Sequence, residues 1–491
     1  MALLRRQKIL CTRVQADSAT PGTHSMHRLS AVLRPAKSAK LSSLPAHRRP
    51  ASHSRLSPCL IFSSYFSSSS SKMGSTLRPN NASTPFKVLV VGGSYSGLAA
   101  ALNLSDMCLG KTARASVSYQ DKVEPVDPIH AEITVVDERD GFYHVIGSPL
   151  VFASKTYAEK AWVTYKEIPA LQASPNIKTV HGSVTSVDFA AKKATVKAVT
   201  DSSSSTIDYD FIIVTSGLRR AYPVVPQSGD KTSYLAEVTP HIESVSNAKD
   251  GVLVVGGGAV GIEMAAELKL VQPQTRVILA HSRSRLLSSE PLPDVLAEKT
   301  LEILKENGVE VLLSHRLQET KEVEGDPNTK IVSFTNGDSL RVNAVVVAIS
   351  KSEPSTSFLP VEAINDEGYV KIQPNLFFPK EIPNSDSALA GGDLVDWSGI
   401  KRCGRAMHMG YYTALNTHQR MQELVNGKTP EYFTLQKTAP VIALALGDNA
   451  IAWGDEVTYG KDIAERFFSN DVGFDICWNI LGMGEKPAAK V

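Results

Sequence analysis

The chain has 491 residues, of which 42% are hydrophobic, and a mean hydropathy of −0.09. This length predicts two or three domains, and the lack of any long uncharged apolar run excludes a membrane-spanning helix. Residues 1–85 hold 13 Lys and Arg and one acid, which leaves 39 basic and 49 acidic residues in 86–491. The net negative charge of residues 86–491 does not favour binding to the phosphate backbone of a nucleic acid, so we expect no nucleic-acid partner.

Residues 1–85 form a basic leader that we expect to be disordered, because 1–72 are rich in Arg, Ser, Ala and His and nearly free of acids. This composition is typical of a mitochondrial presequence, so the sequence predicts mitochondrial localisation. The alternative is translation from Met73, which would give a cytoplasmic or lipid-surface protein. Arg78 then stands where a myristoylation signal requires Ser or Thr.

The first ordered segment is a short β-branched run at 86–91, which is typical of a buried parallel strand. It leads into the loop Gly-Gly-Ser-Tyr-Ser-Gly at 92–97 and then into a helical segment. A tight turn of this kind brings the backbone close to a pyrophosphate at a helix N-terminus. We therefore expect an FAD site, although serine stands at the second glycine position. The expected contacts are Gly92, Gly93, Ser94 and Gly97.

An acid is expected at the end of the next strand, where it accepts hydrogen bonds from ribose hydroxyls. The strand at 133–137 supplies Asp137, with Glu138 as the alternative. Asp137 comes 40 residues after Gly97, where about 20 is usual. We interpret the polar stretch 111–130 as an inserted surface loop that accounts for the extra length.

A second glycine loop follows the strand at 251–255 and precedes another helical segment. Its sequence, Gly-Gly-Gly-Ala-Val-Gly at 256–261, meets all three glycine positions of a dinucleotide site in the required strand, turn and helix context. The sequence therefore predicts an NAD(P)H site. The expected contacts are Gly256, Gly258 and Gly261.

The strand at 276–280 ends in a basic segment, His-Ser-Arg-Ser-Arg at 281–285. An enzyme strict for NAD normally has an acid there, which repels a 2′-phosphate. His281, Arg283 and Arg285 favour NADPH or dual use, because guanidinium groups bind phosphate. The alternative is that these arginines only solvate a loop.

Two further segments frame the glycine loops. The buried strand at 211–214 closes on a small-residue turn at Gly217, which we expect beside a cofactor. After the second loop, a strand ends in Gly391, Gly392 and Asp393. An acid in this position is able to accept from a ribityl hydroxyl of FAD, while the glycines let the flavin approach.

The order of these motifs over 86–425 resembles the pyridine nucleotide-disulfide oxidoreductase superfamily. The sequence Phe142-Tyr143-His144 and the tail resemble its apoptosis-inducing factor 2 and ferroptosis suppressor branch, near type II NADH dehydrogenases. The resemblance implies an α/β fold of two Rossmann-like FAD- and NAD(P)-binding domains, the second inserted in the first, plus a small C-terminal α+β module. The expected parts are FAD domain 86–245 and 351–425, NAD(P)H domain 246–350, and module 426–491.

The five cysteines show neither the CxxxxC nor the CxxC spacing that disulfide reductases of this superfamily carry. We therefore expect electrons to pass from FAD directly to an external acceptor, and the sparse cysteines fit a reducing compartment. No metal-binding motif is present, so no metal site is predicted.

Glu263 and Lys155 are the candidate catalytic residues. The resemblance implies that an acid such as Glu263, two residues past the third glycine, helps to place NAD(P)H. The alternative is a purely structural acid near a helix N-terminus. Lys155 follows an apolar run and would stabilise the anionic reduced flavin, unless it simply faces water. Lys401, Arg402 and His408, at the start of a predicted helix near the flavin, receive no assignment.

The tail predicts two strands at 441–447 and 450–454, followed by a helix. In the resembled branch this module covers the flavin and shapes a quinone pocket. Six apolar residues near the C-terminus would either seat the protein peripherally on a membrane or belong to the core. They are Phe467, Phe468, Phe474, Trp478, Ile480 and Leu481.

The favoured hypothesis is an FAD-dependent oxidoreductase that passes hydride from NAD(P)H to FAD and then electrons to a quinone-type acceptor. A second hypothesis is a biosynthetic flavin oxidoreductase that acts on a small aromatic metabolite. A third is a redox-sensing or cell-death signalling flavoprotein. The sequence predicts no particular oligomeric state.

Overall fold

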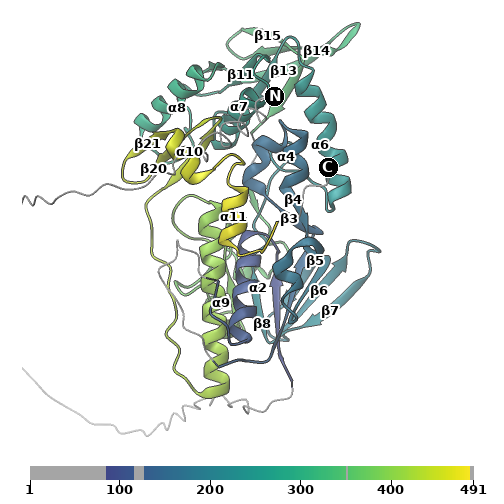
Figure 1. Ribbon diagram of the computed structural model, residues 1–491, viewed down its shortest axis with the longest axis vertical. Helices are drawn as coiled ribbons and strands as arrows, with labels where there is room; N and C mark the ends of the chain where they lie inside the picture. The colour runs from purple at the N-terminus through teal and green to yellow at the C-terminus, as the bar shows by residue number, and fades with distance from the viewer. Residues whose placement is uncertain (1–83, 115–126, 350–351, 487–491) are drawn as a thin grey trace, which may run out of the picture. The chain divides into compact units, whose positions relative to one another are not determined.

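The computed structural model describes residues 84–114, 127–349 and 352–486 (Figure 1). Nearly all of the predicted leader, with Met73 and Arg78, lies outside the described residues, as does much of the predicted inserted loop. The mitochondrial localisation and the alternative start site therefore stay predictions.

A seven-stranded sheet carries the first glycine loop. Its five neighbouring strands β18, β8, β1, β2 and β5 are parallel, and β6 and β7 extend it in antiparallel fashion. The central strands are continuous apolar runs that are buried on both faces, as parallel strands are. In sheet order the strands are β18 (Ala388–Ala390), β8 (Phe211–Val214), β1 (Phe86–Val91), β2 (Ala131–Asp137), β5 (Ile177–Asp188), β6 (Lys193–Ala198) and β7 (Ser204–Asp208).

Helices α2 (Tyr95–Cys108) and α9 (Cys403–Asn426) pack side by side against this sheet (Figure 1). Their close approach depends on Gly410, where a Cβ atom would lie 2.1 Å from the carbonyl oxygen of Ser96. The N-termini of both helices consequently lie near the carboxyl ends of the strands, where the predicted FAD residues are.

The second glycine loop belongs to a separate four-stranded parallel sheet, in the order β12-β11-β10-β16. Helices α7 (Ala259–Val271) and α8 (Asp294–Glu306) accompany it, and a three-stranded antiparallel sheet shares a buried apolar cluster with it. The strands are β10 (Val252–Val255), β11 (Val277–Ala280), β12 (Val309–Leu312), β16 (Ala344–Val347), and β13 (Leu317–Val323), β14 (Asp326–Phe334) and β15 (Ser339–Val342).

The chain order places this second sheet between two neighbouring strands of the first. β8 precedes it, and β18 returns after it to pair with β8 in register Ala388 to Ile212. The predicted α/β class, with one dinucleotide-type unit inserted in another, is confirmed. The residue boundaries of the parts remain a prediction.

Shorter elements connect the two sheets. Antiparallel pairs form between β3 and β4 and between β9 and β17. These elements are β3 (Gly141–Tyr143), α3 (Ser148–Val151), α4 (Lys155–Ala161), β4 (Trp162–Thr164), α5 (Pro169–Gln172), β9 (Leu218–Arg219), α6 (Lys231–Ser246) and β17 (Glu353–Pro354).

The C-terminal segment contains three antiparallel strands, where the sequence predicted two. They are β19 (Ile442–Leu446), β20 (Asn449–Trp453) and β21 (Val457–Gly460), followed by α10 (Lys461–Phe467) and α11 (Phe474–Ile480). The short β21 was missed because its four residues, Val-Thr-Tyr-Gly, are fewer than a strand usually has and end in glycine, which is depleted in strands.

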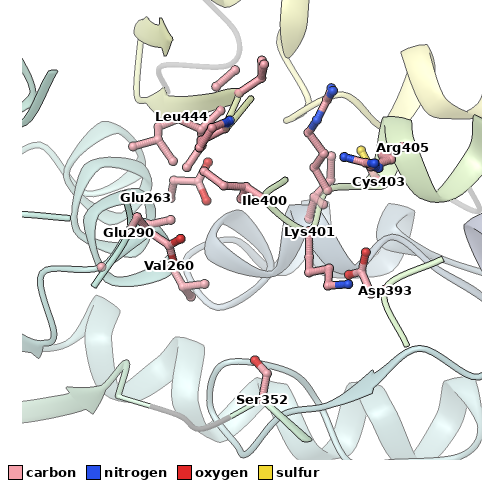
Figure 2. A pocket seen from close by; sticks show the side chains of 18 of the residues that line it. Val260, Glu263, Glu290, Ser352, Asp393, Ile400, Lys401, Cys403, Arg405 and Leu444 are labelled. Carbon is pink, nitrogen blue, oxygen red and sulfur yellow. The ribbon is translucent and has the colours of Figure 1, made fainter. Parts of the chain in front are cut away.

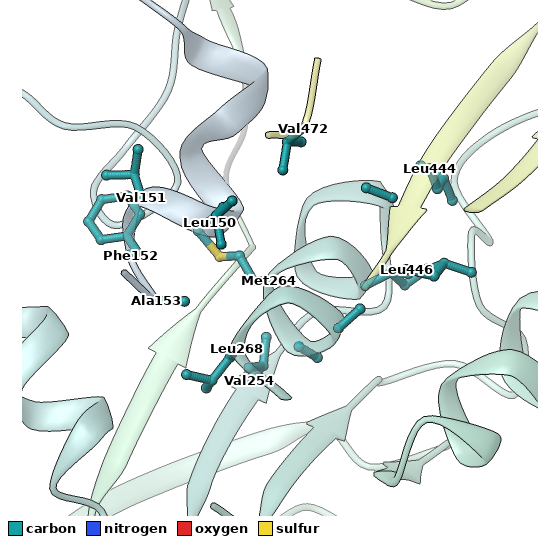
Figure 3. Packing of buried hydrophobic residues seen from close by; sticks show 14 of the residues in the cluster. Leu150, Val151, Phe152, Ala153, Val254, Met264, Leu268, Leu444, Leu446 and Val472 are labelled. Carbon is teal, nitrogen blue, oxygen red and sulfur yellow. The ribbon is translucent and has the colours of Figure 1, made fainter. Parts of the chain in front are cut away.

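The C-terminal segment packs on both parts of the molecule. Leu444 and Leu446 of β19 belong to the same buried cluster as Met264 and Leu268 of α7 (Figure 3). At the other end, Trp478 of α11 lies in the cluster that includes the first turn of α2. Buried apolar area of this kind is the main force that holds the segment in place.

Four of the six apolar tail residues are core residues. Phe468, Phe474, Trp478 and Leu481 are buried, whereas Phe467 is 40% exposed. The core alternative therefore holds for these four, and they are not available to a membrane surface. Among the helices that the structure describes, none combines the length and apolar character needed to span a bilayer.

Candidate active site

Both parallel sheets direct their carboxyl ends towards one large cleft, part of whose lining is shown in Figure 2. Its volume of about 2120 Å³ exceeds the roughly 300–1,000 Å³ of an ordinary small-molecule site. The lining residues come from the loops after β10, β11 and β18, from the start of α9 and from the C-terminal segment. In parallel α/β sheets, ligands bind at this edge.

The first glycine loop has the packing that a dinucleotide loop requires. A Cβ atom at Gly97 would lie 1.7 Å from the carbonyl oxygen of Gly92, so only glycine lets α2 start this close to β1. Ser94 is the N-cap residue, and its side chain makes no capping hydrogen bond. The first turn of α2 carries no acid, which leaves the positive end of the helix dipole to an anion.

Asp137 lies against this loop, as the sequence predicted. Its Oδ2 accepts from the backbone N–H of Gly93 at 2.5 Å, and its Oδ1 accepts from Arg139 N at 2.7 Å. Burial raises the pKa of the Asp137 carboxyl. Glu138, the alternative, forms an ion pair with Arg219 at 2.7 Å. The proposed contact between Asp137 and a ribose stays a prediction.

The loop also has an unsatisfied polar atom. The buried Ser96 Oγ has no hydrogen-bond partner among the described residues. It lies 3.3 Å from the position that a Cβ of Gly391 would take and 3.4 Å from that of Gly392. Gly217, in the turn after β8, has no atom within 4 Å of a would-be Cβ. An orphaned hydroxyl and an open glycine at this edge fit the close approach of FAD.

Asp393 follows β18 and faces two cations. Arg220 Nη2 lies 3.7 Å from Asp393 Oδ2, and Figure 2 shows the Lys401 ammonium pointing towards the same carboxylate. Burial raises the pKa of Asp393, and burial lowers the pKa of Lys401. Lys401 Nζ also donates to Val395 O at 2.6 Å.

Lys401, rather than Lys155, is therefore the lysine in the cleft. Lys155 is the exposed first residue of α4 and does not line the cleft. The expectation that it lies beside the flavin is not met, because Ser154 caps α4 and the helix starts with its first side chain in solvent. Sequence reasoning could not separate the two lysines, since each follows an apolar or glycine-rich turn.

The second glycine loop repeats the packing of the first. A Cβ atom at Gly261 would lie 1.9 Å from the carbonyl oxygen of Gly256. At Gly258, by contrast, a Cβ would meet no atom within 4 Å, and this residue lines the cleft. The N-terminus of α7 thus presents bare backbone to the cleft, which fits the diphosphate of NAD(P)H.

The basic segment after β11 divides into three different roles. His281 Nδ1 accepts from Gly257 N at 3.1 Å and its Nε2 lies 2.9 Å from Ser288 Oγ, while burial lowers its pKa. His281 is therefore a neutral support of the loop rather than a cation for phosphate. Arg285 is paired with Asp294. Arg283 lines the cleft and remains the candidate for a 2′-phosphate.

Glu263 lines the cleft from α7, close to Leu444 of the C-terminal segment (Figure 2). Its Oε1 accepts from the backbone N–H of Ala445 at 3.0 Å. Burial raises the pKa of the Glu263 carboxyl to about 8, with a further contribution from Glu267. This carboxyl is consequently protonated at neutral pH and has an O–H to donate.

Two features of the cleft escaped the sequence analysis. Tyr95 lines the cleft and its hydroxyl lies 3.0 Å from His144 Nδ1, while His144 Nε2 donates to Val472 O at 3.0 Å. Burial lowers the pKa of His144 to about 4, so it is neutral. In addition, the sulfur atoms of Cys403 and Cys477 lie 4.0 Å apart, although 74 residues separate them in sequence.

Two glycine-cornered loops on two parallel sheets, with one cleft lined by Tyr95 of the first loop and by Gly256 and Gly258 of the second, define a protein that binds two dinucleotides. The family comparison agrees: residues 86–410 match the pyridine nucleotide-disulphide oxidoreductase family, and the chain belongs to it. The chain is an FAD-dependent NAD(P)H oxidoreductase, and its cofactors are FAD and NAD(P)H.

Individual relatives support this placement. Oxidoreductase OXR1 of Ajellomyces capsulatus is 45% identical over 469 residues, which cover 94% of this chain and 98% of that protein. Ferroptosis suppressor protein 1 of Taeniopygia guttata is 24% identical over 403 residues, or 81% and 96% of the two chains. The sulfide:quinone oxidoreductase structure from Aquifex aeolicus shares the fold, with a TM-score of 0.57, 15% identity, and coverage of 82% and 93%.

Replacement of Asp393 tests the FAD site. We expect Asp393→Ala to bind FAD about 10- to 100-fold more weakly, because a charge-assisted hydrogen bond contributes about 1.5–3 kcal/mol. The measurement is the ratio of flavin to protein after dialysis. The matched control is Asp396→Ala, three residues on and exposed. Equal flavin retention by both variants would contradict the assignment.

Replacement of Arg283 tests the choice of nicotinamide cofactor. Loss of a phosphate-binding guanidinium should lower kcat/KM for NADPH by about tenfold or more and leave kcat/KM for NADH almost unchanged. Steady-state kinetics of Arg283→Ala with both cofactors measures this. Arg276→Ala is the control, since Arg276 pairs with Glu310 and does not line the cleft. Equal losses with NADPH and NADH would show that Arg283 reads no 2′-phosphate.

Proposed function

We propose that this oxidoreductase delivers the electrons of NAD(P)H to a quinone-type acceptor that binds in the cleft. The observation that carries the proposal is a half-buried carboxyl, Glu263, whose Oε1 accepts from Ala445 N beside Val260, Ile400 and Leu444 of the cleft wall. A quinone is a flat apolar ring with two carbonyl oxygens, so it needs apolar walls and a small number of well-placed donors.

The apolar wall comes from three parts of the chain. Val260 belongs to α7, as does Glu263 itself; Ile400 precedes α9, and the C-terminal segment supplies the remainder. Figure 2 shows Val260, Ile400 and Leu444 around Glu263. The C-terminal members of the wall are Val441, Ile442, Leu444, Phe467, Phe468 and Ile480.

The proton balance of the reaction gives Glu263 a function. Reduction of a quinone to a quinol takes two electrons and two protons, whereas NAD(P)H supplies a hydride, so one proton comes from elsewhere. Bound FAD supplies the chemistry that accepts the hydride and passes on its electrons. Glu263 holds a proton at neutral pH, and its backbone partner Ala445 N fixes Oε1 in place. Glu263 is therefore suited to act as a general acid.

The cations near Asp393 serve the same chemistry. Lys401 and Arg220 flank the Asp393 carboxylate and place positive charge at the edge of the cleft. Positive charge fixed in advance stabilises negative charge that develops during the transfer of a hydride. The name of the fold neighbour from Aquifex aeolicus, a sulfide:quinone oxidoreductase, adds support, because that protein handles a quinone on the same fold.

Acceptor kinetics test the proposal directly. We expect the purified holoenzyme to oxidise NADPH with a soluble ubiquinone analogue at a kcat on the order of 1–1,000 per second, the usual range for enzymes. Absorbance of NADPH and of quinol measures the rate. Turnover with small aromatic metabolites alone would support the biosynthetic hypothesis instead. A slow, long-lived reduced complex would support the signalling hypothesis.

The pH dependence tests the role of Glu263. Because its pKa is about 8 and the protonated form acts as the acid, quinone reduction should be constant below pH 8 and fall up to tenfold per unit above it. Glu263→Gln should lower kcat and remove this limb of the profile. Glu298→Gln is the control, since Glu298 is exposed on α8 and does not line the cleft. An unchanged alkaline limb in Glu263→Gln would refute the role.

A further inference from the structure

Two arginines line the cleft at the start of α9. Arg402 is the exposed N-cap residue of this helix, and Arg405 lies half-buried in its first turn. Within the part of the chain that the structure describes, neither guanidinium group forms an ion pair. The start of α9 therefore presents two positive charges that no neighbouring described acid offsets.

The other two cations at this end of the cleft have a partner. Lys401 and Arg220 flank the carboxylate of Asp393, and Arg220 Nη2 lies 3.7 Å from Asp393 Oδ2. These three residues belong to the predicted FAD site. The arginine pair of Arg402 and Arg405 has no such partner among the described residues, and it is consequently available to a different anionic group.

The arginine pair is electrostatically unfavourable on its own. Nη2 of Arg405 is buried and has no hydrogen-bond partner among the described residues. Burial lowers the pKa of the Arg405 guanidinium, and the positive charge of Arg402 lowers it further. A desolvated charge is costly unless a counter-charge offsets it. An anion beside both guanidinium groups removes this cost, so their surroundings favour an anionic ligand.

The helix itself adds to the attraction for an anion. α9 has 24 residues, no side chain caps its N-terminus, and its first turn contains no acid. The positive end of the helix dipole therefore lies at the same place as the two arginines.

A neighbouring segment fixes Arg405 in position. Thr438 Oγ1 accepts from Arg405 Nη1 at 2.7 Å, and the backbone N–H of Thr438 donates to Ser398 Oγ at 3.1 Å. Gly399 makes room for this contact, because a Cβ atom there would lie 3.0 Å from Thr438 Oγ1 and closer still to Arg405 Nη1. Thr438 also lines the cleft, and its hydroxyl keeps a proton to donate while its oxygen accepts from Arg405.

The arginine pair adjoins the apolar wall proposed for the quinone ring. Ile400, a member of that wall, comes two residues before the first arginine, and in Figure 2 it lies between Glu263 and Arg405. Residues 440–442, which follow Thr438, line the cleft as well. A ligand whose ring rests on this wall is therefore able to extend a short substituent to the arginines.

We propose that Arg402, Arg405 and Thr438 form an anion subsite, which selects acceptors that bear a carboxylate. The acceptor is then a quinone-type ring with a short acidic side chain. Its ring rests on the apolar wall, and its carboxylate binds at the two guanidinium groups. A guanidinium binds a carboxylate through paired N–H···O bonds, which suit a planar group of this size. This inference rests on the proposed quinone-reducing function and adds the substrate class.

Binding of a matched pair of probes tests the subsite without turnover. The probes are a ubiquinone analogue whose side chain is butanoic acid and the methyl ester of the same compound, which has the same ring but no charge. Isothermal titration calorimetry of the oxidised, FAD-loaded full chain, without NADPH, gives both dissociation constants. We expect the acid to bind about 10- to 100-fold more tightly than the ester, because its hydrogen bonds are charge-assisted.

Three variants assign this preference to particular residues. Arg402→Gln and Arg405→Gln should each lower the ratio of the two dissociation constants by about tenfold. Arg402 is exposed, so its replacement keeps the test decisive even if Arg405→Gln folds poorly. Lys437→Gln is the matched control and should keep the wild-type ratio, since Lys437 is exposed, carries the same charge and does not line the cleft.

Equal binding of acid and ester by the wild type, or an unchanged ratio in Arg402→Gln, would overturn the proposal. Loss of flavin from Arg402→Gln would overturn it too, because that result would place the arginine at the FAD site. Steady-state reduction of the ester by NADPH is measured on the same preparation and reports on the quinone proposal alone. An ester that binds without turnover, with the preference for the acid intact, would refute quinone reduction and support the anion subsite.

Discussion

Close packing of a helix against the strand that precedes it is the constraint on which the whole site depends. In both glycine loops, a Cβ atom added to the third glycine would lie within 2 Å of the carbonyl oxygen of the first glycine. The distance is 1.7 Å for Gly97 and 1.9 Å for Gly261. Any side chain would push the helix away from its strand. Because glycine has no side chain, each helix packs directly on its strand. Its N-terminus therefore lies at the edge of the sheet, where the helix dipole favours a diphosphate.

The second requirement is that the carboxyl ends of the two parallel sheets face the same cleft. The C-terminal segment fulfils this requirement because it packs on both parts of the molecule. β19 packs on α7 through Leu444 and Leu446, while α11 buries Trp478 against α2. Polar contacts follow the same two directions, from Ala445 N to Glu263 and from His144 to Val472 O. A segment held at both ends positions the apolar wall, the acid and Cys477 in relation to both cofactor loops.

Features that depend on local sequence were predictable. The two glycine loops and the Gly-Asp turn follow from strands, turns and helices that are each contiguous. The insertion of one domain in the other was implied by the family resemblance that the order of these motifs carries. Asp393 and Glu263 lie at the cleft because each is fixed to such a motif by a few residues. The fold class and the family followed from the order of these motifs.

Features that depend on long-range packing were not predictable. Lys155 and Lys401 have similar sequence contexts. They differ in where the fold places them: Lys155 is exposed at the start of α4, whereas Lys401 lines the cleft just before α9. His281 reads as a cation, yet its contact with Gly257 N and its burial keep it neutral. The Cys403–Cys477 contact joins residues 74 positions apart, so no local spacing encodes it.

The central claim is that both dinucleotides bind in this cleft with their reactive rings in contact. Anaerobic mixing of the purified protein with NADPH, followed by stopped-flow absorbance of the flavin, tests it most directly. The account predicts a yellow protein whose flavin band bleaches in a single rapid phase, with one NADPH consumed for each FAD. A colourless protein that takes up no FAD, or a bound flavin that NADPH fails to bleach, would contradict it.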